Sequence, residues 1–336
     1  MTHQASAMKV RVFNCLPTTL AHYASELSDT LARLQVEVTQ VDSRVPIDSS
    51  RSIVVRGLSH IRQAREISRS DLPTIVIWPA FGWLDGSLWS RSRSRILEIS
   101  HDPVPIRRQF LTGRFWNAVA KRSMRVEWLC HTESAANAAV QVIGTRPRIA
   151  LHPVLSTSPP AREILPGRRG VVSVLGQFKP SRNVDVLREI AETLSPEEYD
   201  LQIIGRGWPH IDGWRVTDRF VSEDDLDRAL DDSDVVVIPY RKYWQSGIAV
   251  RAVERGVSVV GERTEFLTRL LGADYPGLVN NSDSWPHTIA AVANHHDTQT
   301  HAAYVKAVDD SWRPIVDLLR SPSHVRSDNN RIFNTR

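Results

Sequence analysis

A loop in the second half of the chain combines glycine with two cations directly after an apolar run. It follows the strand-like segment Val171–Leu175 and contains Gly176, Gln177, Lys179 and Arg182 before a helical segment begins. Glycine lets the backbone approach a ligand closely, and cations make charge-assisted hydrogen bonds to phosphate oxygens. A helix N-terminus adds N–H groups that point at an anion. This loop therefore has the composition that holds a diphosphate.

Two further loops follow the apolar runs Tyr199–Ile204 and Asp234–Ile238, and both contain glycine. In an open parallel sheet the carboxyl ends of the strands lie along one edge, where ligands bind. We therefore expect the three loops to form one nucleotide-diphosphate site. The candidate residues in the two later loops and the helix that follows them are Gly205, Arg206, Tyr240, Ser246, Gly247 and Glu254.

The first half of the chain offers its best chemical groups at His101 and Asp102, directly after the strand-like run Arg95–Ile99. An imidazole at a carboxyl strand end can contact a substrate, and Asp102 can orient it or act on an acceptor hydroxyl. A histidine satisfied by the backbone is the alternative, because His-Asp-Pro is also turn chemistry. Further acceptor candidates in strand-to-helix connections are Thr18, Trp83 and Asp85.

The elements that must position these groups alternate between apolar strands and helical segments, which favours parallel sheets covered on both faces. We expect an α/β protein with two doubly wound, Rossmann-like domains facing across a cleft. The first domain spans residues 1–155, a linker rich in Ser, Pro and Gly spans 156–170, and the second domain spans 171–299. A helix over 300–320 is expected to cross back to the first domain. The tail, 321–336, has little to bury and is expected to be disordered.

Composition indicates the cellular location of the protein and the state of its cysteines. The chain has 336 residues, a net charge of +4 and two cysteines, Cys15 and Cys130, in apolar surroundings. Its apolar runs are too short for a membrane span, and the N-terminus lacks the order of a signal peptide. We therefore expect a cytoplasmic protein with two buried thiols.

A local excess of positive charge lies between Arg107 and Arg125. It can attract an anionic membrane at the inner face, or a lipid-linked acceptor. The alternative is a solvated basic helix face. Nucleic acid is not expected as a partner, since no recognised module is present. The basic residues are Arg107, Arg108, Arg114, Lys121, Arg122 and Arg125.

The segment from Val171 to Val279 resembles the donor-binding domain of the retaining GT-B glycosyltransferases of family 4. The likeness rests on the loop from Gly176 to Asn183 and on the segments LQIIGRG, SDVVVIPY and RAVERGVSVVGE. The paired glutamates of the family align with Ser246 and Glu254. The resemblance implies that Glu254 accepts both ribose hydroxyls and that cations hold the diphosphate. Gln177 and Ser246 depart from the family pattern, which has an arginine and a glutamate there.

The resemblance implies an enzyme that moves a sugar from a UDP- or GDP-linked donor to an acceptor hydroxyl, in polysaccharide or glycoconjugate assembly. Retention of configuration is implied by the family alone. No metal and no cofactor besides the donor is expected, because cations and a helix N-terminus can stabilise the leaving diphosphate. The predicted catalytic residues are His101, Asp102, Lys179 and Arg182. Two alternatives are a catalytically silent sugar-nucleotide binder and another GT-B enzyme such as a nucleotide-sugar epimerase.

Overall fold

A computed structural model describes residues 8–104, 126–160, 168–280, 284–293 and 298–321 of the chain. The basic stretch from Arg107 to Arg125 and the predicted disordered tail beyond Ser321 lie outside the described residues, as does 161–167 within the predicted linker. Among the helices that are described, each is too short or too polar to cross a lipid bilayer.

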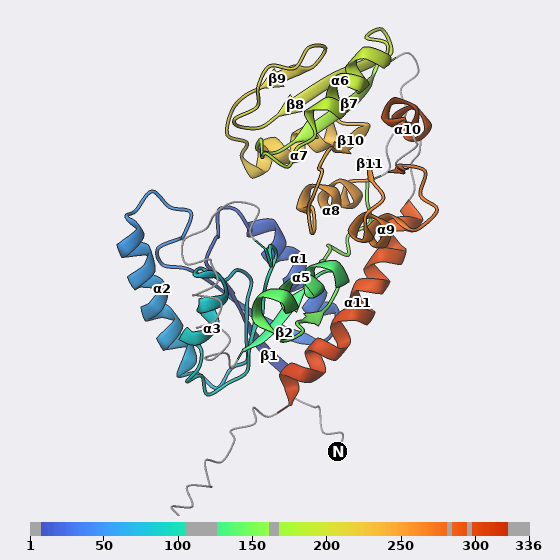
Figure 1. Ribbon diagram of the computed structural model, residues 1–336. Helices are drawn as coiled ribbons and strands as arrows, with labels where there is room; N and C mark the ends of the chain where they lie inside the picture. The colour runs from blue at the N-terminus through green and yellow to red at the C-terminus, as the bar shows by residue number, and fades with distance from the viewer. Residues whose placement is uncertain (1–7, 105–125, 161–167, 281–283, 294–297, 322–336) are drawn as a thin grey trace, which may run out of the picture.

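The first half of the chain folds around a six-stranded parallel sheet with the order β2-β1-β3-β4-β5-β6. Its inner strands β3 and β4 are buried along their whole length, as apolar strands separated by helices require, and helices lie on either side of the sheet (Figure 1). The strands are β1 Met8–Asn14, β2 Val36–Asp42, β3 Thr74–Val76, β4 Ile96–Ile99, β5 Glu127–Cys130 and β6 Arg148–Ile149. The helices are α1 Ala21–Arg33, α2 Ile53–Ser68, the 3-10 turn η1 Gly82–Leu84, α3 Asp85–Leu88 and α5 Glu133–Ile143.

The second half forms another six-stranded parallel sheet, with the order β12-β11-β10-β7-β8-β9. The predicted α/β class with two doubly wound sheets is therefore confirmed. The strands are β7 Gly170–Leu175, β8 Tyr199–Ile204, β9 Arg215–Thr217, β10 Val235–Ile238, β11 Ser258–Glu262 and β12 Leu278–Val279. The helices are α6 Val184–Thr193, α7 Glu223–Asp231, α8 Gly247–Glu254, α9 Glu265–Leu271 and α10 Trp285–Val292.

Side-chain caps fix where several helices begin. Ser52, Thr132, Ser222, Ser246 and Thr264 each accept a hydrogen bond from the backbone N–H three residues further on. Such a cap satisfies one donor that the first helical turn leaves without a partner, and it contributes about 1 kcal/mol. The cap at Ser246 fixes the start of the helix that carries Glu254.

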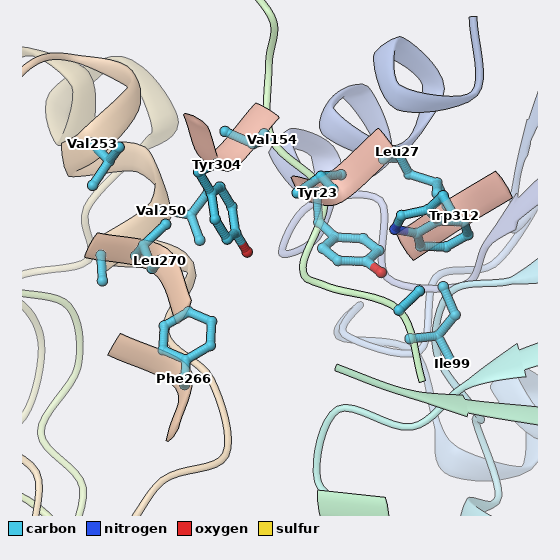
Figure 2. Close-up of a cluster of buried hydrophobic side chains, with 14 of the residues drawn as sticks. Tyr23, Leu27, Ile99, Val154, Val250, Val253, Phe266, Leu270, Tyr304 and Trp312 are labelled. Atoms are coloured by element: carbon cyan, nitrogen blue, oxygen red, sulfur yellow. The ribbon is translucent and has the colours of Figure 1, made fainter. Parts of the chain in front are cut away.

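The long helix α11, Thr298–Arg320, packs against α9 of the second domain and α1 of the first (Figure 1). Its buried indole, Trp312, donates a hydrogen bond to the carbonyl of Leu151 at 2.9 Å, and Tyr304 donates to the carbonyl of His152 at 3.0 Å. Figure 2 shows the core that results, with Leu27 beside Trp312. The helix therefore joins a single apolar core that spans both sheets.

Replacing Trp312 with alanine is predicted to lower the free energy of unfolding by about 3–5 kcal/mol, because it opens a cavity and leaves the Leu151 carbonyl without its donor. Urea unfolding followed by circular dichroism measures the change. Lys306→Ala, at an exposed position on the same helix, is the control and should change stability by less than about 0.5 kcal/mol. Equal stabilities for the two variants would contradict this packing role for α11.

Candidate functional site

A cavity of about 430 Å³ lies where the carboxyl ends of the two sheets face each other. Its volume falls in the range of roughly 300–1,000 Å³ typical of small-molecule sites. Both domains line it, so a ligand there would touch the two halves of the chain together. The predicted site residues that line it are Thr18, His101, Gly176, Gln177, Lys179, Arg182, Gly205, Arg206, Tyr240, Ser246 and Gly247.

Two glycines bring the first two loops of the second domain into contact. Gly176 has a φ of +93°, a conformation that side-chain-bearing residues rarely adopt. A Cβ at Gly205 would lie 2.0 Å from the carbonyl oxygen of Gly176, so only glycine fits there. That same carbonyl accepts a hydrogen bond from the indole of Trp208 at 2.8 Å. The loops after β7 and β8 are therefore fixed against each other at the cavity.

Arg182 is a buried cation at the cavity, with 4% of its surface exposed. Its guanidinium lies 4.1 Å from the ring centroid of Tyr240 and donates to the carbonyl of Leu175 at 2.7 Å. Its Nε has no hydrogen-bond partner among the described residues, and no described acidic side chain forms an ion pair with it. Burial lowers the pKa of Arg182, which shows the cost of holding an uncompensated charge there. An anionic ligand would offset that cost.

Lys179 and Arg206 add two exposed cations to the same cavity. Within the described part of the chain, neither forms an ion pair with an acid. Arg251 also lines the cavity, but Glu223 and Asp227 both pair with its guanidinium, at 2.5 Å each. The positive charge available to a ligand therefore comes from Lys179, Arg182 and Arg206, which belong to the loops that the sequence identified.

The N-terminus of α8 opens at this cavity. Ser246 caps the helix through its hydroxyl, and Ser246, Gly247 and Ile248 all line the space. The first N–H groups of a helix have no acceptor within it, and they carry the positive end of the helix dipole. A Cβ at Gly247 would meet nothing within 4 Å, so a ligand can approach this backbone closely. The site thus combines three cations with a helix N-terminus.

His101 lies at the carboxyl end of β4, as expected, and contacts both domains. Its Nε2–H donates to the carbonyl of Ile77 at 2.8 Å, and its Nδ1 accepts from the side-chain amide of Gln245. Burial, together with the charge of His152, lowers the pKa of His101 to about 3, so the ring is neutral. Both ring nitrogens are engaged, and the catalytic role of His101 stays a prediction.

Asp102 does not line the cavity. Burial raises its pKa, and the charge of Lys179 in the other domain opposes that rise. Asp102 therefore interacts electrostatically with Lys179, a cation that the ligand would use. Its own side chain does not face the cavity. Its action on an acceptor hydroxyl stays a prediction.

Glu254 is placed differently from the expectation. It lies at the last residue of α8 and does not line the cavity. One carboxylate oxygen accepts from His22 Nε2 at 2.6 Å, and the other accepts from the backbone N–H of Leu155 at 2.8 Å. Residues of the first half of the chain thus engage both of its oxygens. Glu254 therefore links the two domains, whereas the sequence analysis expected it to contact ribose.

Glu26 completes a buried cluster with His22 and Glu254. Its Oε1 lies 3.4 Å from His22 Nε2. Although burial opposes a charged imidazole, hydrogen bonds with Glu254 and Glu26 raise the pKa of His22 to about 9. Burial and the nearby charge of Glu254 raise the pKa of Glu26 to about 8. At neutral pH the cluster is therefore best described as a charged imidazole paired with Glu254 beside a protonated Glu26.

The same three residues are the set within the described chain whose ligand atoms could converge on a metal ion, with all atoms within 4.8 Å of one another. A protonated imidazole already neutralises the Glu254 carboxylate and cannot ligate a metal through the same nitrogen. A metal ion bound by these three residues would therefore have to displace the proton that His22 shares with Glu254.

Trp83 and Asp85 lie in the interior, which corrects the prediction that they contact an acceptor. The indole of Trp83 donates to the carbonyl of Pro103 at 3.2 Å and packs edge-on against Trp128. Asp85 is fully buried and bonded to His60 of α2 at 2.9 Å. Neither lines the cavity. The connection after β3 turns inward, because His60 provides a buried partner for the carboxylate.

Several residues that line the cavity were missed by sequence reasoning, including three on α1 and two in the segment before α7. His22 and Glu26 are four residues apart on one face of α1, directly after the turn that contains Thr18. This four-residue spacing was the sequence signal that could have identified His22 and Glu26 as site residues. The missed residues lining the cavity include Thr19, His22, Tyr23, Glu26, His152, Phe220, Val221, Glu223, Gln245 and Arg251.

No protein-family model matches the sequence, and no curated protein matches it either. Solved structures are similar in fold. Anabaena Alr3699/HepE in complex with UDP and glucose matches with a TM-score of 0.59 at 12% identity, over 93% of this chain and 99% of that one. The trehalose-phosphate synthase (UDP-forming) of Burkholderia vietnamiensis matches with a TM-score of 0.58 at 13% identity, over 93% and 99% of the two chains.

A third similar structure is the sucrose-phosphate synthase of Thermosynechococcus elongatus, with a TM-score of 0.56 at 13% identity over 93% of this chain and 94% of that one. The alignments extend over nearly the whole length of both chains. They confirm that the chain has the GT-B fold, with two Rossmann-like units.

Replacing His22 with glutamine is predicted to lower the free energy of unfolding by up to about 3 kcal/mol at pH 6. The figure follows from the pKa of His22, which rises from 6.5 to about 9 in the folded protein. A raised folded pKa gives a stabilisation that is complete below the unfolded pKa and is lost as the pH rises through 9. The difference between wild type and variant should therefore shrink between pH 6.5 and 9.5.

Urea midpoints at several pH values measure this difference, with His210→Gln as the control because the side chain of His210 is 81% exposed. A difference between wild type and His22→Gln that stays constant over the whole pH range would refute the charged pair.

Proposed function

We propose that the protein is a glycosyltransferase that transfers a sugar from a nucleoside-diphosphate sugar to an acceptor hydroxyl. The observation that carries the proposal is the convergence of Lys179, Arg182, Arg206 and the N-terminus of α8 on one cavity between two domains. Solved proteins of similar fold support it, since HepE is seen with UDP-glucose, and S. aureus TarM is seen with UDP.

In this proposal the diphosphate of the donor lies against Lys179, Arg182 and the N–H groups at the start of α8. The acceptor oxygen forms a bond to the anomeric carbon of the sugar while the bond from that carbon to the diphosphate breaks. The hydroxyl proton passes to the departing diphosphate or to solvent. Negative charge grows on the leaving group, so fixed cations and N–H dipoles lower the barrier. These groups provide that stabilisation without a metal ion.

The second domain would hold the donor, because its three loops carry the available cations. The first domain faces the same space with Thr18 and His101, so an acceptor would approach from that side. We propose that Gly176, Gln177, Gly205 and Tyr240 shape the donor site. We also infer a retaining outcome from the resemblance to family 4. Glu254 is left out of the donor site and is assigned to the contact between the domains.

A sugar-nucleotide binder without turnover is the second candidate. The observation that favours it is the engagement of both ring nitrogens of His101, by Ile77 and Gln245. In that case the protein would bind a donor, and no acceptor-linked product would form in its presence.

A thermal-shift panel of UDP, GDP, ADP and their sugars tests donor binding, since a ligand that binds only the folded state raises the melting temperature. We expect one nucleoside diphosphate and its sugar to raise the melting temperature strongly, while the corresponding monophosphate raises it less. The loss of one phosphate removes charge-assisted contacts with the cationic loops. Equal shifts for the mono- and diphosphate would contradict the assigned diphosphate site.

Replacing Lys179 with alanine is predicted to lower turnover by roughly 10²–10³-fold with an unchanged melting temperature, because the exposed ammonium stabilises charge on the leaving group. Sugar transfer, or donor cleavage if the acceptor is unknown, is the measurement. Lys306→Ala removes the same charge from α11 and should leave turnover unchanged. Wild-type turnover in Lys179→Ala would remove this residue from the mechanism.

A further inference from the structure

Helix α2 exposes large apolar side chains in its first two turns. Ile53, Val54, Val55 and Leu58 are exposed by 58%, 65%, 47% and 50%. The buried face of the helix begins at His60 and contains Gln63, Ala64 and Ile67 further along. We call the four exposed residues the α2 patch. They are the main group of exposed large apolar side chains among the described residues, because Val104 and Phe220 are the others.

Positive charge continues the α2 patch along the same face of the helix. Val54, Leu58, Arg62 and Arg65 are spaced at i, i+4, i+8 and i+11, which places them in one stripe. The stripe is aliphatic in its first half and cationic in its second half. All four residues are exposed to solvent.

The acid content of this region is low. Residues 51–69 contain five arginines and a single acid, Glu66. Both carboxylate oxygens of Glu66 accept hydrogen bonds from Arg44, at 3.0 and 2.7 Å. No ion pair with a described acidic side chain engages Arg62 or Arg65. The face therefore presents aliphatic groups next to uncompensated guanidinium groups.

An anionic lipid surface matches this combination of groups. Aliphatic side chains can enter the boundary between headgroups and acyl chains, while arginines with long stems reach the phosphates. Each basic residue near such a surface contributes attraction that weakens with salt. We propose that the α2 patch, with Arg62 and Arg65, binds the protein peripherally to an anionic membrane.

The first turn of α2 lies on the same side of the first domain as the cavity. The helix follows β2, so its first turn lies at the carboxyl edge of the first sheet, where the cavity also lies. Asp48, in the segment before α2, accepts a hydrogen bond at 2.8 Å from Thr19, which lines the cavity. A membrane held against α2 would lie beside the first-domain rim of the cavity. If the proposed function holds, an acceptor embedded in that membrane could be reached from there.

The test uses the full chain and co-sedimentation with vesicles of phosphatidylcholine and phosphatidylglycerol, compared with phosphatidylcholine alone. The wild-type protein should sediment with the anionic vesicles at low salt and be released at high salt. Two variants should reduce the bound fraction by more than about tenfold, namely Val54→Ser with Leu58→Ser, and Arg62→Gln with Arg65→Gln. The control, Arg188→Gln with Arg313→Gln, removes equal charge from exposed sites on α6 and α11.

Failure of the wild type to bind anionic vesicles would overturn the proposal. So would unchanged binding of the two α2 variants, which would assign the contact to another part of the chain. A wild-type dimer that the apolar variant converts to a monomer would show that a second copy covers the patch. All changes are at exposed positions, and circular dichroism checks that the fold is kept. Vesicle binding requires no turnover, so its outcome is separable from that of the proposed function.

Discussion

The contact between His22 and Glu254 is the interaction on which the geometry of the site depends. It links α1 of the first domain to the end of α8, the helix whose other end opens at the cavity. The second oxygen of Glu254 holds the backbone of Leu155, where the chain leaves the first domain. One carboxylate thus fixes the helix N-terminus, the first domain and the interdomain segment relative to one another.

A second carboxylate acts in the same way. Glu265 of α9 accepts the backbone N–H groups of Glu133 and Ser134 at 2.7 and 2.9 Å, so the second domain helps to cap a helix of the first. Such contacts cost little additional conformational entropy, because an apolar core that includes α11 already joins the two sheets. The cavity is consequently bounded by two sheets held at a defined separation, which gives a ligand access to both halves of the chain.

The sequence was most informative where chemistry and topology follow directly from local pattern. Valine-rich runs such as Val235–Ile238 predicted buried parallel strands, and the loops with Gly176 and Arg182 were expected at the carboxyl edge and are found there. Short elements such as β9 and α9 carry too few residues for a clear period, and they were not anticipated.

The misplaced residues were those whose partners come from distant parts of the chain. The acceptor role predicted for Asp85 could not be judged without His60, which is 25 residues earlier and buried beside it. Glu254 was assigned to ribose by resemblance, yet its partner His22 lies 232 residues away. Arg251, three residues before Glu254 on α8, faces the cavity instead. The sequence shows which residues share one face of a helix. Which of those faces lines the cavity depends on tertiary packing.

Hydrogen–deuterium exchange with and without the most stabilising nucleoside diphosphate tests the central claim most directly, namely that one interdomain cavity is the ligand site. The account predicts slower exchange on nucleotide addition in peptides that cover 176–182 and 245–251 together, because both surround the same cavity. Protection confined to other segments, or protection of one of these loops without the other, would contradict it.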